Sequence, residues 1–546
     1  MAEFEKPDLI PGTDIIFTDG NDGENATPVE VVLIPQPTSN LDDPLNWSTT
    51  WKSIIIFNQF VFVFVSILTP MAISPLSLIF ETEFDKTLPE VNMLFGVAAI
   101  TLGYSNFVIV PAANLWGRRP VILVCGLICI LANIWQALVT SYPSFLGARV
   151  ISGLGAGANE SIMPMVVADL LFQHQLGRSM ALYFWAYFLG LFIGPIISGA
   201  IASHISWRWF FWVCTILQGA SFILLLVAHP ETKYERPAPR PSTRRNSSVV
   251  SDKLECGGIS SSSSELPHAL ITAHHRVAGR PSRAQFSLLP MRKHLRPGGE
   301  AGGREQSVAS RLLQDVASPV RILACYPIVT WASFTMGFAA NSLLALFLTS
   351  AQVFGAPPYL FSPAQIGFVN FAFVVGAAAA LVTAGPLSDR VALGRARRNG
   401  GVLEAEMRLP ALVPYVCANV VGMVVVAVGY QRAWPWEAVV VAGYTLVGLQ
   451  VVGIPAIAIA YAIDSYKTLP GEIMIAATIA KNTFGFGMIF YFNDWSERSG
   501  YIKPVLMMMG ITTGFSVLGL VVFTPCGKQF RRWTKDSKLH SLGVKA

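Results

Sequence analysis

A single carboxylate, Glu160, lies in the middle of a long apolar segment, residues 145–172. An ionisable group at that depth in a bilayer is costly unless it is paired or faces a cavity. Because burial favours the neutral form of a carboxyl group, Glu160 could bind and release a proton in a repeated cycle. The same carboxylate could instead bind a cationic substrate, or it could be hydrogen-bonded to a neighbouring helix and have no functional role.

Two basic residues also fall within apolar segments. Arg149 lies near the start of the segment that contains Glu160, where its long side chain could reach the membrane interface. Lys481 lies within residues 473–492 and could pair with a carboxylate or with a backbone carbonyl. Polar or aromatic groups in other apolar segments could line a central cavity or bond between helices: Asn58, Gln59, Asn341 and Tyr461.

Long apolar segments must position these residues. The chain has 546 residues, of which 53% are hydrophobic and 13% charged, about half the charged share of a soluble domain. The apolar residues form blocks of about 20 residues, the length that crosses a bilayer core. Lipid admits only helices or closed barrels, and these blocks are too long and too uniformly apolar for barrel strands. We expect helices at 53–74, 91–112, 121–140, 145–172, 179–202, 207–229, 322–348, 366–387, 409–430, 436–462, 473–492 and 504–523.

The twelve expected helices form two six-helix halves with the same layout. In each half a basic, Gly-containing turn follows the second helix. The first turn is Gly117-Arg118-Arg119, and the second runs from Gly385 to Arg390. Paired halves are typical of secondary transporters, in which a site between the halves opens to either side of the membrane. The predicted fold class is therefore an all-α membrane protein.

Loop charge sets the expected orientation. Lys and Arg are concentrated in alternate loops and in the tail, whereas loop 352–365 carries no charge. This positive-inside bias places both termini and the central loop in the cytoplasm. The expected divisions are a cytoplasmic N-terminal segment, a first half, a linker, a second half and a cytoplasmic tail, at 1–52, 53–229, 230–320, 321–525 and 526–546.

The central linker is rich in Ser, Pro, Gly and basic residues and has few large apolar residues, so we expect it to be disordered. Within it, Ser247 follows Arg244 and Arg245 and is a candidate phosphorylation site. A phosphate there would add a charge of nearly −2. Short basic strings followed by Ser also arise by chance in such linkers.

Several motifs resemble the major facilitator superfamily. The first basic turn is similar to that family's loop between helices two and three, although Asn114 occupies the acidic position. The resemblance implies that this loop locks the two halves in one conformation, here through Asn114, Gly117, Arg118 and Arg119. The second-half copy keeps the family's residues at Gly385, Asp389 and Arg390.

Two further motifs extend the resemblance. Arg149-x-x-x-Gly153-x-Gly155 resembles the motif whose Arg is linked to proton transfer. The string Gly190-x-x-x-Gly194-Pro195-x-x-x-Gly199 resembles the antiporter motif of drug:proton exchangers. Small residues four apart allow close helix approach, and proline removes one helix hydrogen bond. A generic packing face is therefore the alternative interpretation of this helix.

Other strings narrow the resemblance to a fungal branch of the drug:proton antiporter family, which includes transporters of histidinol and polyamines. They include Ala158-Asn-Glu160-Ser and Tyr461-Ala-Ile-Asp464-Ser-Tyr466. The carboxylates near the expected cytoplasmic helix ends are candidate gate or capping groups: Asp169, Asp464 and Glu472.

The sequence predicts a proton-coupled transporter of the plasma membrane that exports small amphiphilic or cationic organic compounds by alternating access. Proton-coupled uptake of a small organic cation is the alternative, and a receptor-like homologue that senses without transport is a third. An enzyme is disfavoured because the sequence has no Walker phosphate loop, no His-Glu-x-x-His motif and no His cluster.

The same interpretation predicts the partners of the protein. We expect a functional monomer in the lipid bilayer that binds a small-molecule substrate and uses the proton gradient without a cofactor. Nucleic acid is not expected, because the basic residues behind the net charge of +6 form no binding face. No metal is expected either, because Cys125 and Cys129 have no His or carboxylate near them in the sequence.

Overall fold

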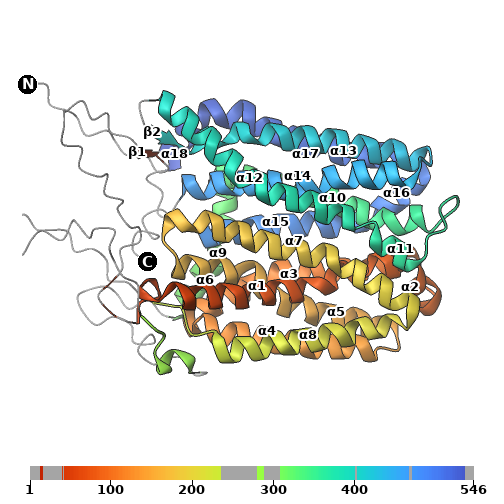
Figure 1. Cartoon of the computed structure of the whole chain (residues 1–546), viewed down its shortest axis with the longest axis horizontal. Helices are drawn as coiled ribbons and strands as arrows, with labels where there is room; N and C mark the ends of the chain where they lie inside the picture. Colours follow the sequence, from red (N-terminus) through yellow and green to blue (C-terminus); the bar gives the residue numbers. More distant parts are fainter. Residues whose placement is uncertain are drawn as a thin grey trace, which may run out of the picture.

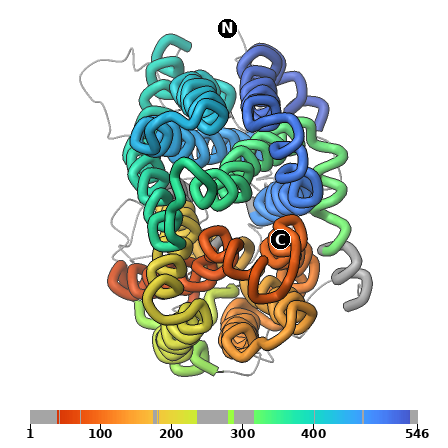
Figure 2. The backbone as a smooth tube through the Cα atoms, turned by 90° about the vertical axis from the view of Figure 1, so that its right-hand side faces the viewer, coloured from red at the N-terminus to blue at the C-terminus, as the bar shows by residue number. Residues whose placement is uncertain are grey.

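The computed structural model describes residues 13–15, 38, 40, 42–234, 279–287, 308–399, 402–466 and 470–534. Almost all of these residues are helical, and the helices run side by side along the long axis (Figure 1). They form two bundles that lie against each other, with the N-terminal bundle in red to yellow and the C-terminal bundle in green to blue (Figure 2). The predicted fold of two helical halves is confirmed.

The first half contains eight α-helices. They are α1 (Thr49–Met71), α2 (Ser77–Phe84), α3 (Leu88–Trp116), α4 (Arg118–Leu138), α5 (Tyr142–Ala156), α6 (Ala158–Leu170), α7 (Gln173–His204) and α8 (Trp207–Ala228). The short 3-10 helices η1 (Pro44–Asn46) and η2 (Ser74–Leu76) lie on either side of α1.

The described residues of the second half form ten α-helices. They are α9 (Val308–Cys325), α10 (Pro327–Phe354), α11 (Pro363–Phe368), α12 (Phe371–Arg398), α13 (Val413–Gln431), α14 (Thr445–Ser465), α15 (Pro470–Ile489), α16 (Phe492–Ser499), α17 (Ile502–Leu518) and α18 (Thr524–Thr534). The 3-10 helix η5 (Ala405–Leu412) precedes α13, and the π-helical turns η6 (Ala438–Tyr444) and η7 (Gly519–Phe523) precede α14 and α18. Strand β1 (Thr13–Ile15) pairs antiparallel with β2 (Val402–Glu404).

In the described part of the chain, ten helices are long and apolar enough to cross a membrane, or eleven if the bent pair α15 and α16 forms one span. The expected span at 145–172 is instead divided into α5 and α6, which meet at Gly157. A Cβ atom at Gly157 would lie 1.8 Å from Ser105 Oγ on α3, so only glycine fits this crossing. The boundary between the two shorter helices therefore lies where the chain packs closely on α3.

The sequence predicts a disordered linker at residues 230–320, but parts of this segment are structured. Residues 235–278 and 288–307, which include Ser247, lie outside the described residues. Residues 279–287 contain the 3-10 helix η3 (Arg283–Phe286), and the Gly279 carbonyl accepts a hydrogen bond from the Ser48 N–H just before α1. Helix α9 begins within the predicted linker, and its Ile322 side chain is buried in the core. These apolar and backbone contacts give structure to residues 279–287 and to the C-terminal part of the segment.

The two ends of the bundle differ in how the halves meet. We call the end with η1 and α18 proximal and the opposite end distal. At the distal end Ser74 Oγ donates to the Phe347 carbonyl at 2.8 Å and lies 3.0 Å from Ser350 Oγ. The Asn92 Nδ2 also donates to Asn493 Oδ1 across the halves at 3.3 Å. The halves are therefore hydrogen-bonded to each other at the distal end.

Candidate substrate-binding site

A cavity lies between the two halves. Its wall is mostly aliphatic and aromatic, with a small number of polar groups, as is usual for sites that bind small organic molecules. The lining residues come from α1, α3, α6 and α7 of the first half and from α10, α14 and α15 of the second: Ile67, Pro70, Phe95, Ala99, Leu102, Glu160, Tyr183, Phe184, Tyr187, Phe188, Leu191, Met336, Ala340, Asn341, Leu343, Leu344, Pro455, Lys481, Asn482 and Gly485.

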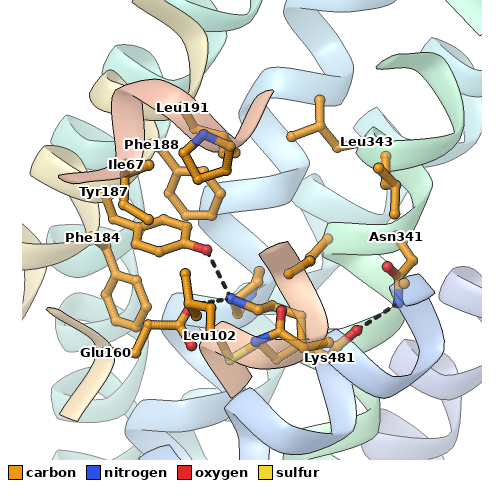
Figure 3. A pocket seen from close by; sticks show the side chains of 18 of the residues that line it. Ile67, Leu102, Glu160, Phe184, Tyr187, Phe188, Leu191, Asn341, Leu343 and Lys481 are labelled. Carbon is orange, nitrogen blue, oxygen red and sulfur yellow. Dashed lines mark hydrogen bonds and ion pairs between the residues drawn. The ribbon is translucent and has the colours of Figure 1, made fainter. Parts of the chain in front are cut away.

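The two deep charges predicted from the sequence meet in this cavity (Figure 3). Lys481 Nζ lies 2.5 Å from Glu160 Oε1, and both side chains are buried, with 8% and 2% of their surface exposed. The same ammonium donates a hydrogen bond to the Tyr187 hydroxyl at 2.9 Å and lies 4.8 Å from the centre of the Tyr187 ring. Lys481 is thus held by a carboxylate, a hydroxyl and an aromatic face.

Helix geometry places Glu160 at this point. The residue lies in the first turn of α6, directly after the interruption at Gly157. The N-terminal turn of a helix carries a partial positive charge, which favours a carboxylate there. The second carboxylate oxygen, Oε2, is buried and accepts no hydrogen bond within the described residues. The interruption in this span therefore brings a carboxylate with a free acceptor into the cavity.

Neighbouring helices fix the backbone at Lys481. Asn341 Nδ2 on α10 donates to the Lys481 carbonyl at 3.3 Å. A Cβ atom at Gly337 would lie 3.4 Å from Lys481 Cα, and one at Gly103 on α3 would lie 2.8 Å from Asn482 Nδ2. Helix α15 is therefore packed closely on both halves where it carries the ammonium group.

The pair changes the expected charge balance of the site. The sequence allowed the buried Glu160 carboxylate to bind a proton, to bind a cationic substrate or to be hydrogen-bonded to a neighbouring helix. In this conformation the Lys481 ammonium balances that charge, and the pair as a whole is neutral. Removing one partner of a buried ion pair costs about 3–5 kcal/mol, because an uncompensated charge is left behind. Since α6 belongs to the first half and α15 to the second, the pair also joins the two halves.

Arg149 lies outside the cavity. Its side chain is fully buried, so it does not extend to the membrane interface as one interpretation of the sequence allowed. The guanidinium donates to the Leu94, Thr69 and Pro70 carbonyls at 2.8, 3.2 and 3.0 Å, and to Gln136 Oε1 at 3.2 Å. The last carbonyls of a helix lack partners within the helix, and Arg149 supplies donors to those of α1.

Of the four expected cavity-lining polar residues, only Asn341 lines this cavity. Gln59 Nε2 lies 3.3 Å from the ring of His229, beyond the proximal end of α8. Asn58 is buried elsewhere on α1, and its Nδ2 has no hydrogen-bond partner in the described residues. Tyr461 packs edge-on against Trp331, with ring centres 5.9 Å apart. Asn58, Gln59 and Tyr461 are therefore not among the residues that line this cavity.

The first basic turn is held by a carboxylate that the sequence interpretation missed. Glu231 accepts hydrogen bonds from the Arg118 and Arg119 N–H groups at 2.8 and 3.0 Å. Gly117 has a φ of 105°, and a Cβ atom there would lie 2.3 Å from Glu231 Oε2. Glu231 follows α8 in the sequence, and this position near a helix end was the only available signal. It provides the negative charge that Asn114 cannot provide.

The other groups of this turn also have defined partners. Arg118 Nε pairs with Asp169 Oδ2 at the end of α6, at 3.1 Å. Arg119 Nη2 donates to the Leu226 carbonyl at 2.7 Å, near the end of α8. Asn114 contributes its backbone carbonyl, which accepts a hydrogen bond from Lys233 Nζ at 2.5 Å. The turn therefore ties together the proximal ends of α3, α4, α6 and α8.

The second half repeats this arrangement with a residue of η5. Arg408 pairs with Asp389 on α12 at 2.5 Å and with Asp464 at the end of α14 at 2.6 Å. Arg408 lies just before α13, which belongs to the third long apolar helix of its half, just as Arg118 starts α4, the third long apolar helix of the first half. Arg390 and Gly385 are exposed on α12, and Glu472 lies in the first turn of α15. Asp169 and Asp464 thus occupy equivalent places, which supports their expected grouping.

The glycines of α7 meet two different neighbours. A Cβ atom at Gly190 or Gly194 would lie 2.5 or 2.1 Å from the Phe64 or Leu68 carbonyl oxygen of α1, within the same half. A Cβ atom at Gly199 would lie 2.3 Å from the Pro363 carbonyl oxygen of α11, in the other half. The helix continues through Pro195. The motif therefore packs α7 onto its own half and onto the partner half at the distal end.

Comparison with known proteins assigns the chain to a family. The family model described as Major Facilitator Superfamily matches residues 55–486. The chain belongs to the Major Facilitator Superfamily. Its match includes both halves and the Glu160–Lys481 pair between them.

Similar proteins within the superfamily include fungal transporters. The chain is 26% identical to Protein HOL1 of Saccharomyces cerevisiae, over 99% of this chain and 98% of the relative. It is 25% identical to the probable efflux pump mfs2 of Aspergillus flavus, over 77% of this chain and 89% of the relative. A partially occluded inward-open structure of the xylose transporter XylE from E. coli has a TM-score of 0.57 and 14% identity, over 87% of this chain and 98% of that chain. The last comparison supports the fold.

Proposed function

We propose that the protein is a proton-coupled secondary transporter of small amphiphilic organic cations, driven by the proton gradient and working as a monomer in the plasma membrane. The observation that carries the proposal is the buried Glu160–Lys481 pair in a cavity lined by aromatic and aliphatic side chains. A carboxylate at that depth can be neutralised by a proton or by a cation, and competition between the two couples their movement.

The proposed cycle is alternating access. The halves are hydrogen-bonded at the distal end, and the basic loops at the proximal end are expected to face the cytoplasm. On that orientation the present conformation is closed toward the outside. Reorientation would separate the distal contacts and bring the proximal ends together, so that the cavity opens outward.

Export is the proposed direction. Two features support it: the similarity to a probable efflux pump and the antiporter-like glycine motif of α7. Uptake would use the same cavity with the gradient acting in the same direction as the substrate. The direction of flux relative to the proton gradient distinguishes the two.

Transport by purified protein in liposomes tests the proposal. Uptake of labelled lipophilic amines into vesicles would be followed with and without an imposed pH gradient, for wild type and Glu160→Gln. We expect gradient-driven flux in wild type and its loss in Glu160→Gln, while the matched surface change Glu437→Gln keeps it. Gradient-driven flux at the wild-type rate in Glu160→Gln would refute proton coupling through this carboxylate.

A further inference from the structure

The position of the Lys481 ammonium suggests a role beyond charge balance. We propose that Lys481 is a built-in competitor, whose ammonium occupies the same position as the ammonium of a bound substrate. This inference rests on the proposed function, because it concerns the same cavity. We call the position between Glu160 Oε1, the Tyr187 hydroxyl and the Tyr187 ring the ammonium site.

The contacts of the ammonium site are those that any alkylammonium group would make. Lys481 Nζ has one short contact to a carboxylate oxygen, one to a hydroxyl and one to an aromatic face. A lysine side chain from Cβ onward is a butylammonium group, so a free primary amine carries the same donors on a similar apolar stem. The stem of such an amine could lie against Phe184 and Phe188, which line the same cavity.

The cavity has acceptor capacity that Lys481 does not use. Glu160 Oε2 is almost completely buried and accepts no hydrogen bond within the described residues. An ammonium group has three N–H donors. The Lys481 ammonium contacts Glu160 Oε1 and the Tyr187 hydroxyl. A free amine, which is not attached to α15, can adopt an orientation that also reaches Oε2.

Competition of this kind has two consequences. A substrate must displace Lys481, so the apparent dissociation constant equals the intrinsic one divided by the fraction of time that the site is free of the lysine ammonium. If Lys481 holds the ammonium site about nine-tenths of the time, the apparent dissociation constant is raised about tenfold. Without substrate, Lys481 balances Glu160, so the pair joins the two halves until a substrate or a proton replaces the lysine ammonium.

The test measures binding of n-hexylammonium to the full-length protein in nanodiscs. Lys481→Met removes the charge and keeps a chain of similar length, and Lys481→Arg keeps the charge. We expect Lys481→Met to bind hexylammonium about tenfold more tightly than wild type, and Lys481→Arg to bind it as weakly as wild type. The uncharged analogue n-hexanol should bind equally to all three. Equal or weaker binding of hexylammonium by Lys481→Met would overturn the proposal.

Lys481→Met leaves Glu160 without a counter-charge, so this variant is expected to be less stable than wild type. A second measurement therefore compares thermal unfolding temperatures with and without ligand. Hexylammonium should raise the thermal unfolding temperature of Lys481→Met more than that of wild type, and hexanol should not. Lys86→Met, which removes a lysine from an exposed pair with Glu90, is the matched control and should resemble wild type. No selective stabilisation of Lys481→Met would also overturn the proposal.

The two proposals fail in different ways. If Lys481→Met binds hexylammonium no more tightly while wild type still carries out gradient-driven flux, only the competitor role is wrong. If wild type shows no flux for any amine although Lys481→Met binds hexylammonium tightly, the ammonium site stands and the transport proposal fails.

Discussion

At the scale of single residues, the protein balances a few buried charges one against another. Sequence reasoning found Glu160 and Lys481 because each lies in the middle of an apolar segment. It could not find their pairing, because the two residues are 321 positions apart and belong to different halves. Glu231 and Arg408 were missed for a related reason: near a helix end, a charged residue usually has only a topological role.

The Glu160–Lys481 pair makes a prediction about stability. Glu160→Gln leaves the Lys481 ammonium buried without a counter-charge, so we expect the free energy of unfolding to fall by about 3–5 kcal/mol. Glu160→Gln combined with Lys481→Met removes both charges and should recover most of that loss. Thermal unfolding of the purified variants in detergent measures both effects. A double variant as unstable as Glu160→Gln alone would show that the loss has another origin.

The hydrogen bonds at the start of α4 make a second prediction. Glu231→Gln replaces a charged acceptor of two backbone N–H groups at a helix N-terminus, and we expect a loss of about 1 kcal/mol. Gly117→Ala should cost more, because φ is 105° and the new Cβ would overlap Glu231. Gly385→Ala is the matched control in the second half, where no atom lies within 4 Å of the new Cβ. Equal thermal unfolding temperatures for Gly117→Ala and Gly385→Ala would contradict this explanation.

At the scale of elements, the sequence predicted the long helices well, because uniform hydrophobicity over about 20 residues is a strong signal. Three features were not predictable in this way. The interruption of α5 and α6 depends on contacts of Gly157 with α3, and α11 is separated from α12 near Asn370. Strand β2 pairs with β1, more than 380 residues away in the sequence. Such features depend on partners distant in sequence, and no local pattern reports them.

The two neighbours of α7 lead to a prediction at this scale. Gly194→Leu places bulk against the Leu68 carbonyl of α1 within one half, so we expect mainly loss of folded protein. Gly199→Leu places bulk against Pro363 of the other half, so we expect normal folding with a shift toward the conformation open at the distal end. Surface expression and flux per folded molecule separate the effects. Similar losses of folded protein in both variants would mean that the contact of Gly199 with α11 is needed for folding and not for the change of conformation.

Pro195→Ala is the comparison within the same helix. It restores a backbone donor without adding bulk, and we expect less loss of folded protein than in Gly194→Leu. Flux per folded molecule should fall if the proline contributes to movement of the helix. Normal flux per molecule would show that this proline contributes only to packing.

At the scale of the whole molecule, the halves touch at the distal end and can be trapped there. Ser74 Oγ and Ser350 Oγ lie 3.0 Å apart in opposite halves. We expect the double variant Ser74→Cys/Ser350→Cys to form a disulfide under oxidation, stopping transport, and to recover on reduction. Each single cysteine variant is a control and should transport under both conditions. Normal flux in the cross-linked protein would show that the distal contacts do not separate during transport.

The orientation of the whole bundle gives a final prediction. Tags inserted at residues 260–264 should be protected from an impermeant reagent outside intact cells, and tags at Pro357 should be labelled. Permeabilised cells provide the control, because both tags should then react. Labelling of residues 260–264 from outside would reverse the assignment of the proximal end to the cytoplasm.

The division of the Glu160–Lys481 pair between two halves also limits how the protein can vary through evolution. A change at either position alone leaves a charge in the interior, whereas a joint change to two neutral residues, or an exchange of the acid and the base, leaves the interior neutral. We therefore expect these two positions, one in each half, to change together among related sequences. We expect related proteins with such a joint change to transport a compound of different charge, since the binding residues and the compound must remain complementary.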